Sequence, residues 1–451
     1  MSYIPNTQQE QMQMLKACGL SEIDDLFSQI PTTLKLKQPL NLPGPLAEAS
    51  LIKHMNILAS KNINLDTATS FLGAGAYDHL VPSVIKHLVS RGEFLTAYTP
   101  YQAEISQGVL QSIFEFQTLI AELTGMEAAN ASMYDGATAL AEAALLACNA
   151  TRRRKVGLPA NLHPEWIEVA RTYLENQDIE PVIIPYQSDS GQIDIATMDA
   201  SLAKELSCLV VQQPNFFGCI EDVTGICSWI KNGDGLLVAA VNPISLGILK
   251  RPGDYGADIV VGDGGSLGNP LSYGGPTVGF FATSGTSLIR RMPGRIVGET
   301  IDGESKRGYV LTMQTREQHI RREKATSNIC TNQALNALVA TMYLSLLGKQ
   351  GLRAVANQCL QKTAYLQQAL LRAGYQRRFT GPCFNEFTIS GDVDWAKVNH
   401  QMLDKGFLAG LPLQQFDKDL SDSLLLAVTE ARTKEEIDEF SGLLGGYCSG
   451  S

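Results

Sequence analysis

Short, continuously apolar runs recur through the middle of the chain and constrain its fold more than any other feature. In Cys208 to Val211 and in Leu236 to Val241, apolar side chains follow one another without alternating with polar ones. Such strands have both faces covered, as in a parallel sheet between two layers of helices. Runs of this kind, separated by helical stretches, predict strands at 129–134, 181–185, 208–213, 236–241, 259–262 and 277–282. The sequence therefore predicts an α/β sandwich between Glu127 and Thr283.

The two ends of the chain have different patterns. After about residue 350, we expect helix 352–373, strand 384–390, helix 395–405, strand 424–428 and a helix after Thr433, where Glu436 completes a capping box. Residues 1–45 carry a short helix near 21–28 and then a segment rich in Pro and Leu, which is typical of an arm. We therefore expect an N-terminal arm at 1–45, a large α/β domain at 46–349 and a small α+β domain at 350–451.

Composition narrows the class of protein. With 451 residues, 44% of them hydrophobic, the chain can bury more than one core, and its net charge of −10 argues against binding nucleic acid. No apolar run approaches the roughly 20 residues of a membrane helix, and residues 1–15 are polar, so we expect a cytoplasmic protein without a membrane segment. The nine cysteines are scattered without a Cys-x-x-Cys pair, which indicates buried, reduced thiols and no metal site.

The segment Asp135 to Ala139 follows a predicted strand and opens a predicted helix at 139–147. Gly136 would let a ligand approach the backbone, Thr138 offers a hydroxyl, and the helix start presents free N–H groups to an anion. A phosphate site is one interpretation of this segment. An ordinary turn between a strand and a helix is equally compatible with it.

A glycine-rich stretch between Asp258 and Gly279 predicts a strand, a loop and a second strand. Enzymes that use pyridoxal phosphate carry a lysine in a loop of this kind, because the cofactor is bound covalently through an amine. No lysine occurs between Arg251 and Ser305. Such enzymes also need a carboxylate near the end of a core strand, where this chain has the uncharged Asn242, which is better explained as a turn residue before proline.

Three further segments could bind small ligands. Residues 315–328 combine five basic side chains with the hydroxyls of Thr326 and Ser327, which suits an anion clamp, although a solvated basic helix end has the same composition. Tyr98 and Tyr101 could present two phenols to a polar ligand, although nearby tyrosines usually pack. His163 could stack on a cofactor ring, although a lone histidine is more often a turn residue.

Taken together, several short motifs in this sequence resemble those of the P-protein of the glycine cleavage system. They occur in the expected order and over essentially the whole chain. The similarity is greatest to the first subunit of the two-subunit form. The motifs lie at 98–108, 116–118, 130–132, 135–139, 163–164, 213–218, 291–298 and 315–332.

The resemblance implies an aminotransferase-like, fold-type I pyridoxal-phosphate architecture. It also implies an enzyme that acts as a complex, decarboxylates glycine and passes the aminomethyl group to the lipoyl cofactor of the H-protein. In this family the cofactor lysine of the two-subunit form belongs to the second (beta) subunit, in an expected α2β2 assembly, which agrees with the missing lysine here. The T- and L-proteins of the same system would be indirect partners.

The resemblance also suggests roles for single residues. Tyr98 and Tyr101 would be contributed to the substrate side of the partner's active site. Thr326, Ser327 and Asn328 would be contributed to the phosphate of the partner's cofactor. Gly136, Thr138, His163 and Asn242 would line a degenerate pocket of this chain's own, without covalently bound cofactor.

Three rival functions stay open at the level of sequence. An autonomous pyridoxal-phosphate decarboxylase would need a lysine from elsewhere, such as Lys250 or Lys324. A purely structural scaffold subunit would need none of the residues above for catalysis. A nicotinamide dehydrogenase is disfavoured because no Gly-x-Gly-x-x-Gly word opens an early βαβ unit.

Overall fold

The computed structural model describes residues 5–95, 99–314, 317–325 and 327–448, and the chain divides into two compact units at Ile63. The first unit holds α1 (Gln8–Ala17), the short 3-10 helix η1 (Ile23–Phe27) and α2 (Glu48–Ala59). None of its described residues is buried. The helix expected near 21–28 corresponds to η1, whereas α1 and α2 were not expected. The proposed arm boundary at residue 45 stays a prediction.

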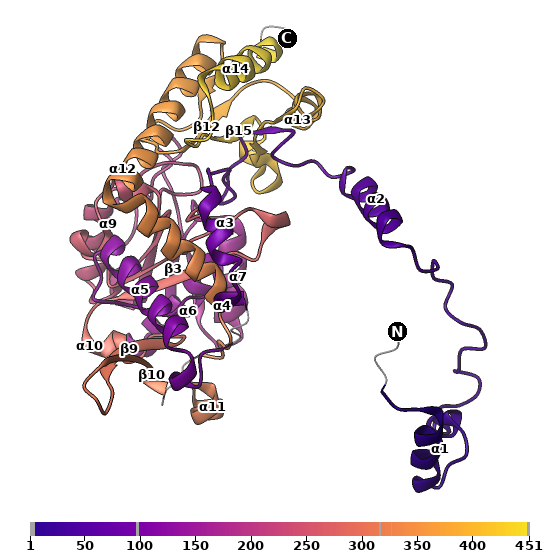
Figure 1. The fold of residues 1–451 in the computed structure, drawn as a ribbon. Coiled ribbons are helices and arrows are strands. Elements are labelled where there is room, and N and C mark those ends of the chain that lie inside the picture. The colour runs from indigo at the N-terminus through magenta and orange to yellow at the C-terminus, as the bar shows by residue number, and fades with distance from the viewer. Residues whose placement is uncertain (1–4, 96–98, 315–316, 326, 449–451) are drawn as a thin grey trace. The chain divides into compact units, whose positions relative to one another are not determined.

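The second unit, residues 64–451, is drawn from purple to yellow in Figure 1. It is built on a seven-stranded sheet with the order β2-β8-β7-β6-β5-β3-β4. Five of the six strands predicted for this region are present. The strand predicted at 129–134 is wrong in extent, because the structure has only the short β2 at 128–129 and an isolated bridge at Met133, and a further strand, β3, was missed. The strands are β2 (Ala128–Ala129), β3 (Lys155–Pro159), β4 (Glu180–Ile184), β5 (Leu206–Gln213), β6 (Leu236–Val241), β7 (Ile259–Asp263) and β8 (Gly279–Thr283).

The sheet is parallel from β4 to β7, but β8 runs antiparallel to β7, which corrects the expectation of a wholly parallel sheet. The physical reason is the connection. A parallel neighbour needs a crossover, usually an α-helix, that carries the chain back to the start of the next strand, whereas the loop 264–278 holds only the short 3-10 helix η5 (Ser272–Gly274) and brings β8 back beside β7 in the opposite direction. Gly264 N–H, for example, donates to the carbonyl of Val278 across this loop.

Helices cover both faces of the sheet, which explains the continuously apolar strands. Leu209 and Val211 of β5 pack with one layer, and Cys208 and Val210 pack with the other. The first layer includes α5 (Gln107–Thr124), α9 (Val223–Lys231) and the start of α12 (Ala334–Arg372), and the second contains α6 (Gly136–Thr151) and α7 (Pro164–Glu175). The shorter helices of this region are α3 (Ser83–Val89), α4 (Gly92–Leu95), α8 (Ala200–Glu205), α10 (Thr286–Ile289) and α11 (Gln318–Arg321).

The C-terminal part has its own sheet and core. Helix α12 contains a break at Gly348, where φ is 59°, next to the domain boundary that the sequence suggests and that stays a prediction. The second sheet has the order β11-β12-β15-β14. Its elements are β11 (Gln376–Arg377), β12 (Glu386–Ser390), α13 (Trp395–Leu403), β14 (Leu411–Pro412), β15 (Ser423–Ala427) and α14 (Lys434–Cys448). The capping box before α14 is confirmed, since Thr433 and Glu436 exchange hydrogen bonds of 2.7 and 3.1 Å.

Two short two-stranded sheets complete the unit. Strand β1 (Thr69–Ser70) pairs with β13 (Phe407–Leu408), and β9 (Ile296–Ile301) forms a hairpin with β10 (Arg307–Thr312). Throughout the described ranges, no helix combines the length and apolar character needed to cross a bilayer. None of the nine cysteines is in a disulfide. The expectation that they are buried holds for four of them, Cys148, Cys208, Cys219 and Cys359. It is wrong for the partly buried Cys227, Cys383 and Cys448 and for Cys18 and Cys330, which are exposed because they lie in the first unit and in a surface loop.

Candidate functional site

A small pocket lies at the carboxyl ends of the central strands, where open α/β sheets bind ligands. We call it the sheet-edge pocket. Its volume is about 50 Å³. Pockets for cofactor-sized molecules measure roughly 300–1,000 Å³, whereas a water needs only about 10–15 Å³. The pocket therefore has room for waters and not for a cofactor. Its lining includes Tyr77, Trp166, Gln212, Asn242, Asp263 and Glu386.

The start of α6 is the phosphate site that the sequence suggests. Its backbone N–H groups already donate hydrogen bonds to carboxylates of this chain. Gly136 N–H donates to Asp263 at 3.2 Å, and Thr138 N–H donates to Asp135 at 2.7 Å. A Cβ atom on Gly136 would lie 2.3 Å from the Trp166 ring, so the indole packs directly on the helix start. Burial raises the pKa of Asp263 despite its three hydrogen bonds. A phosphate at this position would meet carboxylates instead of free amides.

Asn242 closes its own turn. Its side-chain oxygen accepts from Ile244 N–H at 3.0 Å, which is the turn geometry that the sequence offers as the simpler explanation. The amide carries no charge with which to hold a protonated pyridine ring, and the neighbouring glycine-rich loop has no lysine. The residues of the sheet-edge pocket therefore do not fit pyridoxal phosphate. The roles of Gly136, Thr138 and Asn242 toward a ligand stay predictions.

A buried carboxylate from the C-terminal sheet also lines the sheet-edge pocket, and no sequence pattern indicates it. Glu386 of β12 accepts from Ala74 N–H at 2.6 Å and from the Tyr77 hydroxyl at 2.7 Å. Burial raises its pKa from 4.5 to about 7. Because the partners are more than 300 positions apart in the chain, no local pattern could have found this contact.

His163 serves as the cap of α7. Its Nδ1 accepts from Glu165 N–H at 3.2 Å, its Nε2 lies 3.1 Å from the carbonyl oxygen of Ala74, and the ring meets Phe216 edge-on at 4.9 Å. Burial lowers the pKa of the imidazole, which favours the neutral ring. Stacking of this ring on a cofactor stays a prediction.

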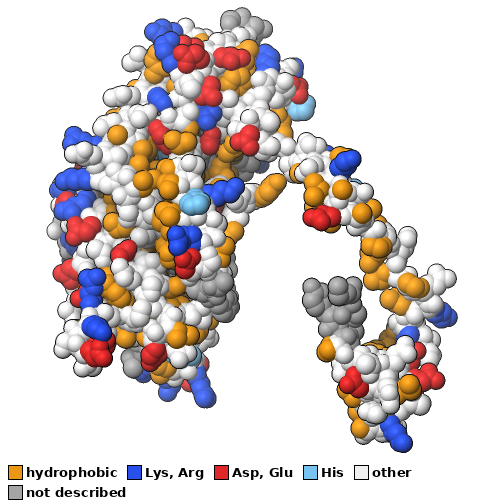
Figure 2. Space-filling model, viewed as in Figure 1, with side chains coloured by type: hydrophobic (Ala, Val, Ile, Leu, Met, Phe, Trp, Pro, Cys, Tyr) orange, Lys and Arg blue, Asp and Glu red, His pale blue; other side chains and the backbone are white. Residues whose placement is uncertain are grey.

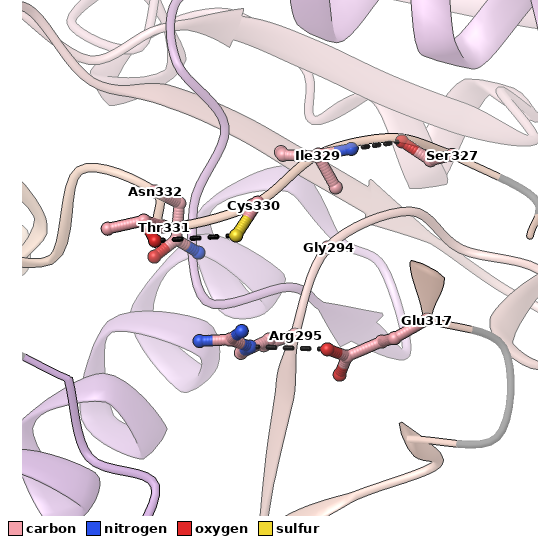
Figure 3. A pocket seen from close by; sticks show the side chains of 8 residues that line it. All are labelled: Gly294, Arg295, Glu317, Ser327, Ile329, Cys330, Thr331 and Asn332. Atoms are coloured by element: carbon pink, nitrogen blue, oxygen red, sulfur yellow. Dashed lines mark hydrogen bonds and ion pairs between the residues drawn. The ribbon is translucent and has the colours of Figure 1, made fainter. Parts of the chain in front are cut away.

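A second region, on the side of the sheet where the β9–β10 hairpin lies, is centred on an ion pair. Arg295 Nε lies 3.3 Å from a carboxylate oxygen of Glu317, and only about 15% of either side chain is exposed (Figure 3). The guanidinium lies 4.1 Å from the centre of the Tyr101 ring. These residues line a cleft of about 600 Å³ that also includes His319 and Cys330. The cleft is large enough for a small ligand or for a segment of a partner.

The loop 327–332, which we call the clamp loop, forms the other wall of this region (Figure 3). The Tyr134 hydroxyl donates to the Cys330 carbonyl at 2.7 Å and accepts from the Cys330 N–H at 2.8 Å. Thr331 has a φ of 50°, a conformation that is unfavourable for a β-branched residue and is found mainly where the surroundings or a function require it. The sequence did not single out Tyr134, whose hydroxyl fixes the backbone of this loop.

The structure brings together some of the site residues that the sequence suggests. Tyr101 contacts Arg295, and Arg295 and Ser327 line the same small pocket. Asn328 is exposed and lies with Ser327 in a neighbouring groove of about 800 Å³. That groove also contains the cations Arg152, Arg291, Arg322 and Lys324. Tyr98 and Thr326 lie outside the described residues.

Comparison with known proteins decides the family. A family model described as "Glycine cleavage system P-protein" matches residues 1–444. The chain belongs to this family. Among its P-protein relatives, the "Probable glycine dehydrogenase (decarboxylating) subunit 1" of Carboxydothermus hydrogenoformans is 53% identical over 446 residues, which cover 99% of this chain and all of the relative. The protein of the same name from Desulforamulus reducens is 54% identical over 446 residues, which cover 99% of each chain.

Solved structures confirm the fold class. The crystal structure of a glycine decarboxylase (P-protein) of the glycine cleavage system, in inhibitor-bound form, is 42% identical, with a TM-score of 0.88 over 99% of this chain and all of that one. An aspartate aminotransferase from Thermus thermophilus shares the fold at 16% identity, with a TM-score of 0.56 over 84% of this chain and 98% of that one. This P-protein chain therefore has the fold-type I architecture of pyridoxal-phosphate enzymes that the resemblance implied.

Proposed function

We propose that this chain is the first subunit of a two-subunit decarboxylating glycine dehydrogenase and that it supplies residues to an active site whose cofactor is held by the second subunit. The observation that carries the proposal is the pairing of full-length likeness to subunit 1 proteins with a small sheet-edge pocket of about 50 Å³ beside a glycine-rich loop that has no lysine. Both carboxylates at the start of α6 and the missing lysine support it. An autonomous decarboxylase is disfavoured for the same reasons.

The residues that this chain would contribute lie around the clamp loop. Ser327 and Asn328, together with Thr326, would donate hydrogen bonds to the phosphate of the partner's cofactor, and the cations of the adjacent groove would favour its negative charge. Tyr101, with Tyr98, would lie on the substrate side of the same site. Pyridoxal phosphate, when bound by the partner, supplies an electron sink for the pair left by the departing CO2.

The partners follow from this assignment. The second subunit would complete an α2β2 assembly and carry the cofactor lysine, and lipoylated H-protein would receive the aminomethyl group. The T- and L-proteins would act on later steps without contacting this site directly. We further propose that the chain is cytoplasmic.

Cys330 provides a test of the proposed interface. In the free chain its thiol is exposed in the clamp loop, so it should react readily with iodoacetamide. We expect the rate of alkylation to fall sharply when the second subunit is added, because the clamp loop becomes buried. Peptide mass spectrometry would measure Cys330 separately from the exposed Cys18, and Cys330→Ser would confirm the assignment. An unchanged rate at Cys330 in an assembled complex would place the clamp loop outside the interface and contradict the proposal.

A further inference from the structure

Helix α6 contains a single charged residue, Glu142, in the middle of a buried apolar stretch. Glu142 of α6 is only 5% exposed, although removing a carboxylate from water is costly. No ion pair within the described residues includes it. Its buried neighbours along the helix are Ala139, Leu140, Ala141, Ala143, Ala144, Leu145 and Leu146. A buried acid at this position is therefore expected to hold a proton more easily than an acid in water. Whether it is protonated determines whether it donates or accepts in its hydrogen bonds.

Glu142 contacts the clamp loop through one side chain. Its Oε1 lies 2.7 Å from the Ser327 hydroxyl oxygen, and that oxygen also accepts from Ile329 N–H at 3.1 Å. A serine hydroxyl has one hydrogen to donate and two lone pairs with which to accept. The Ile329 N–H uses one lone pair. The direction of the bond to Glu142 therefore decides whether the hydroxyl hydrogen of Ser327 is available to anything else.

The two forms of Glu142 give opposite results at Ser327. An ionised Glu142 can only accept, so Ser327 must donate its hydrogen inward and has none for an anion. A protonated Glu142 can donate to the second lone pair of Ser327, which leaves the serine hydrogen free to point into the groove. The observed distance is compatible with either direction, because both groups can carry the hydrogen.

We propose that Glu142 is a positioning residue that, in its protonated form, donates to Ser327 and thereby frees the serine hydroxyl to donate to an anion, the phosphate of the partner's cofactor. The inference rests on the proposed function and deepens it, because it couples cofactor binding to one proton on this chain. Burial raises the pKa of Glu142 from 4.5 to about 7, so the proton is exchanged near neutral pH.

Other titratable and charged groups line the same groove. Those that line it with Glu142 are Tyr173 of α7, Arg152 at the end of α6, Arg291, and Arg322, Glu323 and Lys324 before the clamp loop. The cations favour both an ionised Glu142 and a bound phosphate. Once a phosphate is bound, its charge opposes a carboxylate beside it, which strengthens the preference for the protonated acid.

The test is the pH dependence of cofactor affinity in the reconstituted two-subunit enzyme. Pyridoxal phosphate is titrated from pH 6 to 8.5, with bound cofactor followed by absorbance. For the wild type, we expect the affinity to fall as pH rises above about 7, by up to about tenfold per pH unit for one linked proton. Glu142→Gln imitates the neutral acid, since its amide can donate to Ser327. We expect this variant to bind within about threefold of the wild type at pH 6 and to lose this component of the pH dependence.

Matched variants make the result decisive. Ser327→Ala should bind the cofactor more weakly than the wild type below pH 7, and the difference should shrink as pH rises and the wild-type serine hydrogen turns toward the ionised Glu142. Glu221→Gln should keep the wild-type pH dependence. Glu221 is also buried, but it is bonded to Asn161 and Asn215, away from the clamp loop. An infrared difference spectrum between cofactor-bound and cofactor-free enzyme should show a carboxylic-acid band that Glu142→Gln lacks. This band tests protonation in the wild type even if a variant does not fold.

The outcomes separate the two levels of the proposal. If Glu142→Gln keeps the full wild-type pH dependence, or binds as weakly as Ser327→Ala, or if the infrared band is missing, the positioning role of Glu142 is wrong while the proposed function stands. If Ser327→Ala and Asn328→Ala both leave cofactor affinity unchanged, the clamp loop does not reach the phosphate. That result would overturn this inference together with the contacts assigned under the proposed function.

Discussion

Tyr101→Phe is expected to lower the turnover of the reconstituted two-subunit enzyme by about 10- to 1,000-fold, the cost of losing one hydrogen bond made mainly in the transition state. The substitution keeps the ring, which lies 4.1 Å from the Arg295 guanidinium, and removes only the hydroxyl of this cleft-lining residue. Assembly and cofactor content should therefore stay nearly unchanged. We expect the same of Tyr98→Phe, at a position outside the described residues.

The matched control for this prediction is Tyr365→Phe. That hydroxyl donates to Asp438 at 2.6 Å and joins α12 to α14, and it lines neither the cleft nor the groove beside the clamp loop. Exchange of labelled CO2 with glycine, measured beside cofactor absorbance, would follow the reaction and the cofactor separately. If both Tyr98→Phe and Tyr101→Phe exchange CO2 at the wild-type rate, the two tyrosines only pack, and the subunit's contribution at this position is structural.

The free energy of unfolding should fall as pH rises from about 4.5 to 7, because three buried glutamates lose their protons in this range. Burial raises the pKa values of Glu142, Glu221 and Glu386 from 4.5 to about 7. Within this window the native state binds more protons than the unfolded state, so each group's contribution to the free energy of unfolding decreases with rising pH. The full loss above pH 7 is about 3 kcal/mol for each group, from 1.36 kcal/mol per pKa unit.

Glutamine variants isolate this effect from the other titrating groups. The free energy of unfolding of Glu142→Gln, Glu221→Gln or Glu386→Gln, relative to the wild type, should rise by up to about 3 kcal/mol between pH 4.5 and 8. Lost hydrogen bonds would shift each difference by a constant amount without changing its slope. Chemical denaturation of the isolated chain at several pH values would measure it. A flat difference for all three variants, indistinguishable from that of the exposed Glu439→Gln, would show that folding does not raise the pKa of these acids and would contradict the prediction.

The strands and the C-terminal helices could be predicted because their signals are local. A strand covered on both faces needs a continuous apolar run, and the Thr433 capping box lies within four residues. Strand β3 was missed because it follows three arginines and contains only a few apolar residues. The reversed direction of β8 depends on where a loop returns, which the strand's own residues do not determine.

The candidate site shows the same division between local and distant information. The missing lysine and the residues of the clamp loop can be recognised from short stretches of the sequence alone. The ring of Tyr101 beneath Arg295, by contrast, joins positions almost 200 residues apart. Glu142 has no signal at all, because a single acid in an apolar helix has the same pattern whether it faces water or a buried serine. Only the packing of α6 against the clamp loop distinguishes the two.

The location of the covalently bound cofactor tests the central claim most directly. The reconstituted enzyme would be treated with borohydride in the presence of pyridoxal phosphate, and the modified lysine would be identified by peptide mass spectrometry in each subunit. We predict a stoichiometric label on the second subunit only, and no label on this chain when it is treated alone. A stoichiometric label on a lysine of this chain, such as Lys250 or Lys324, would contradict the account.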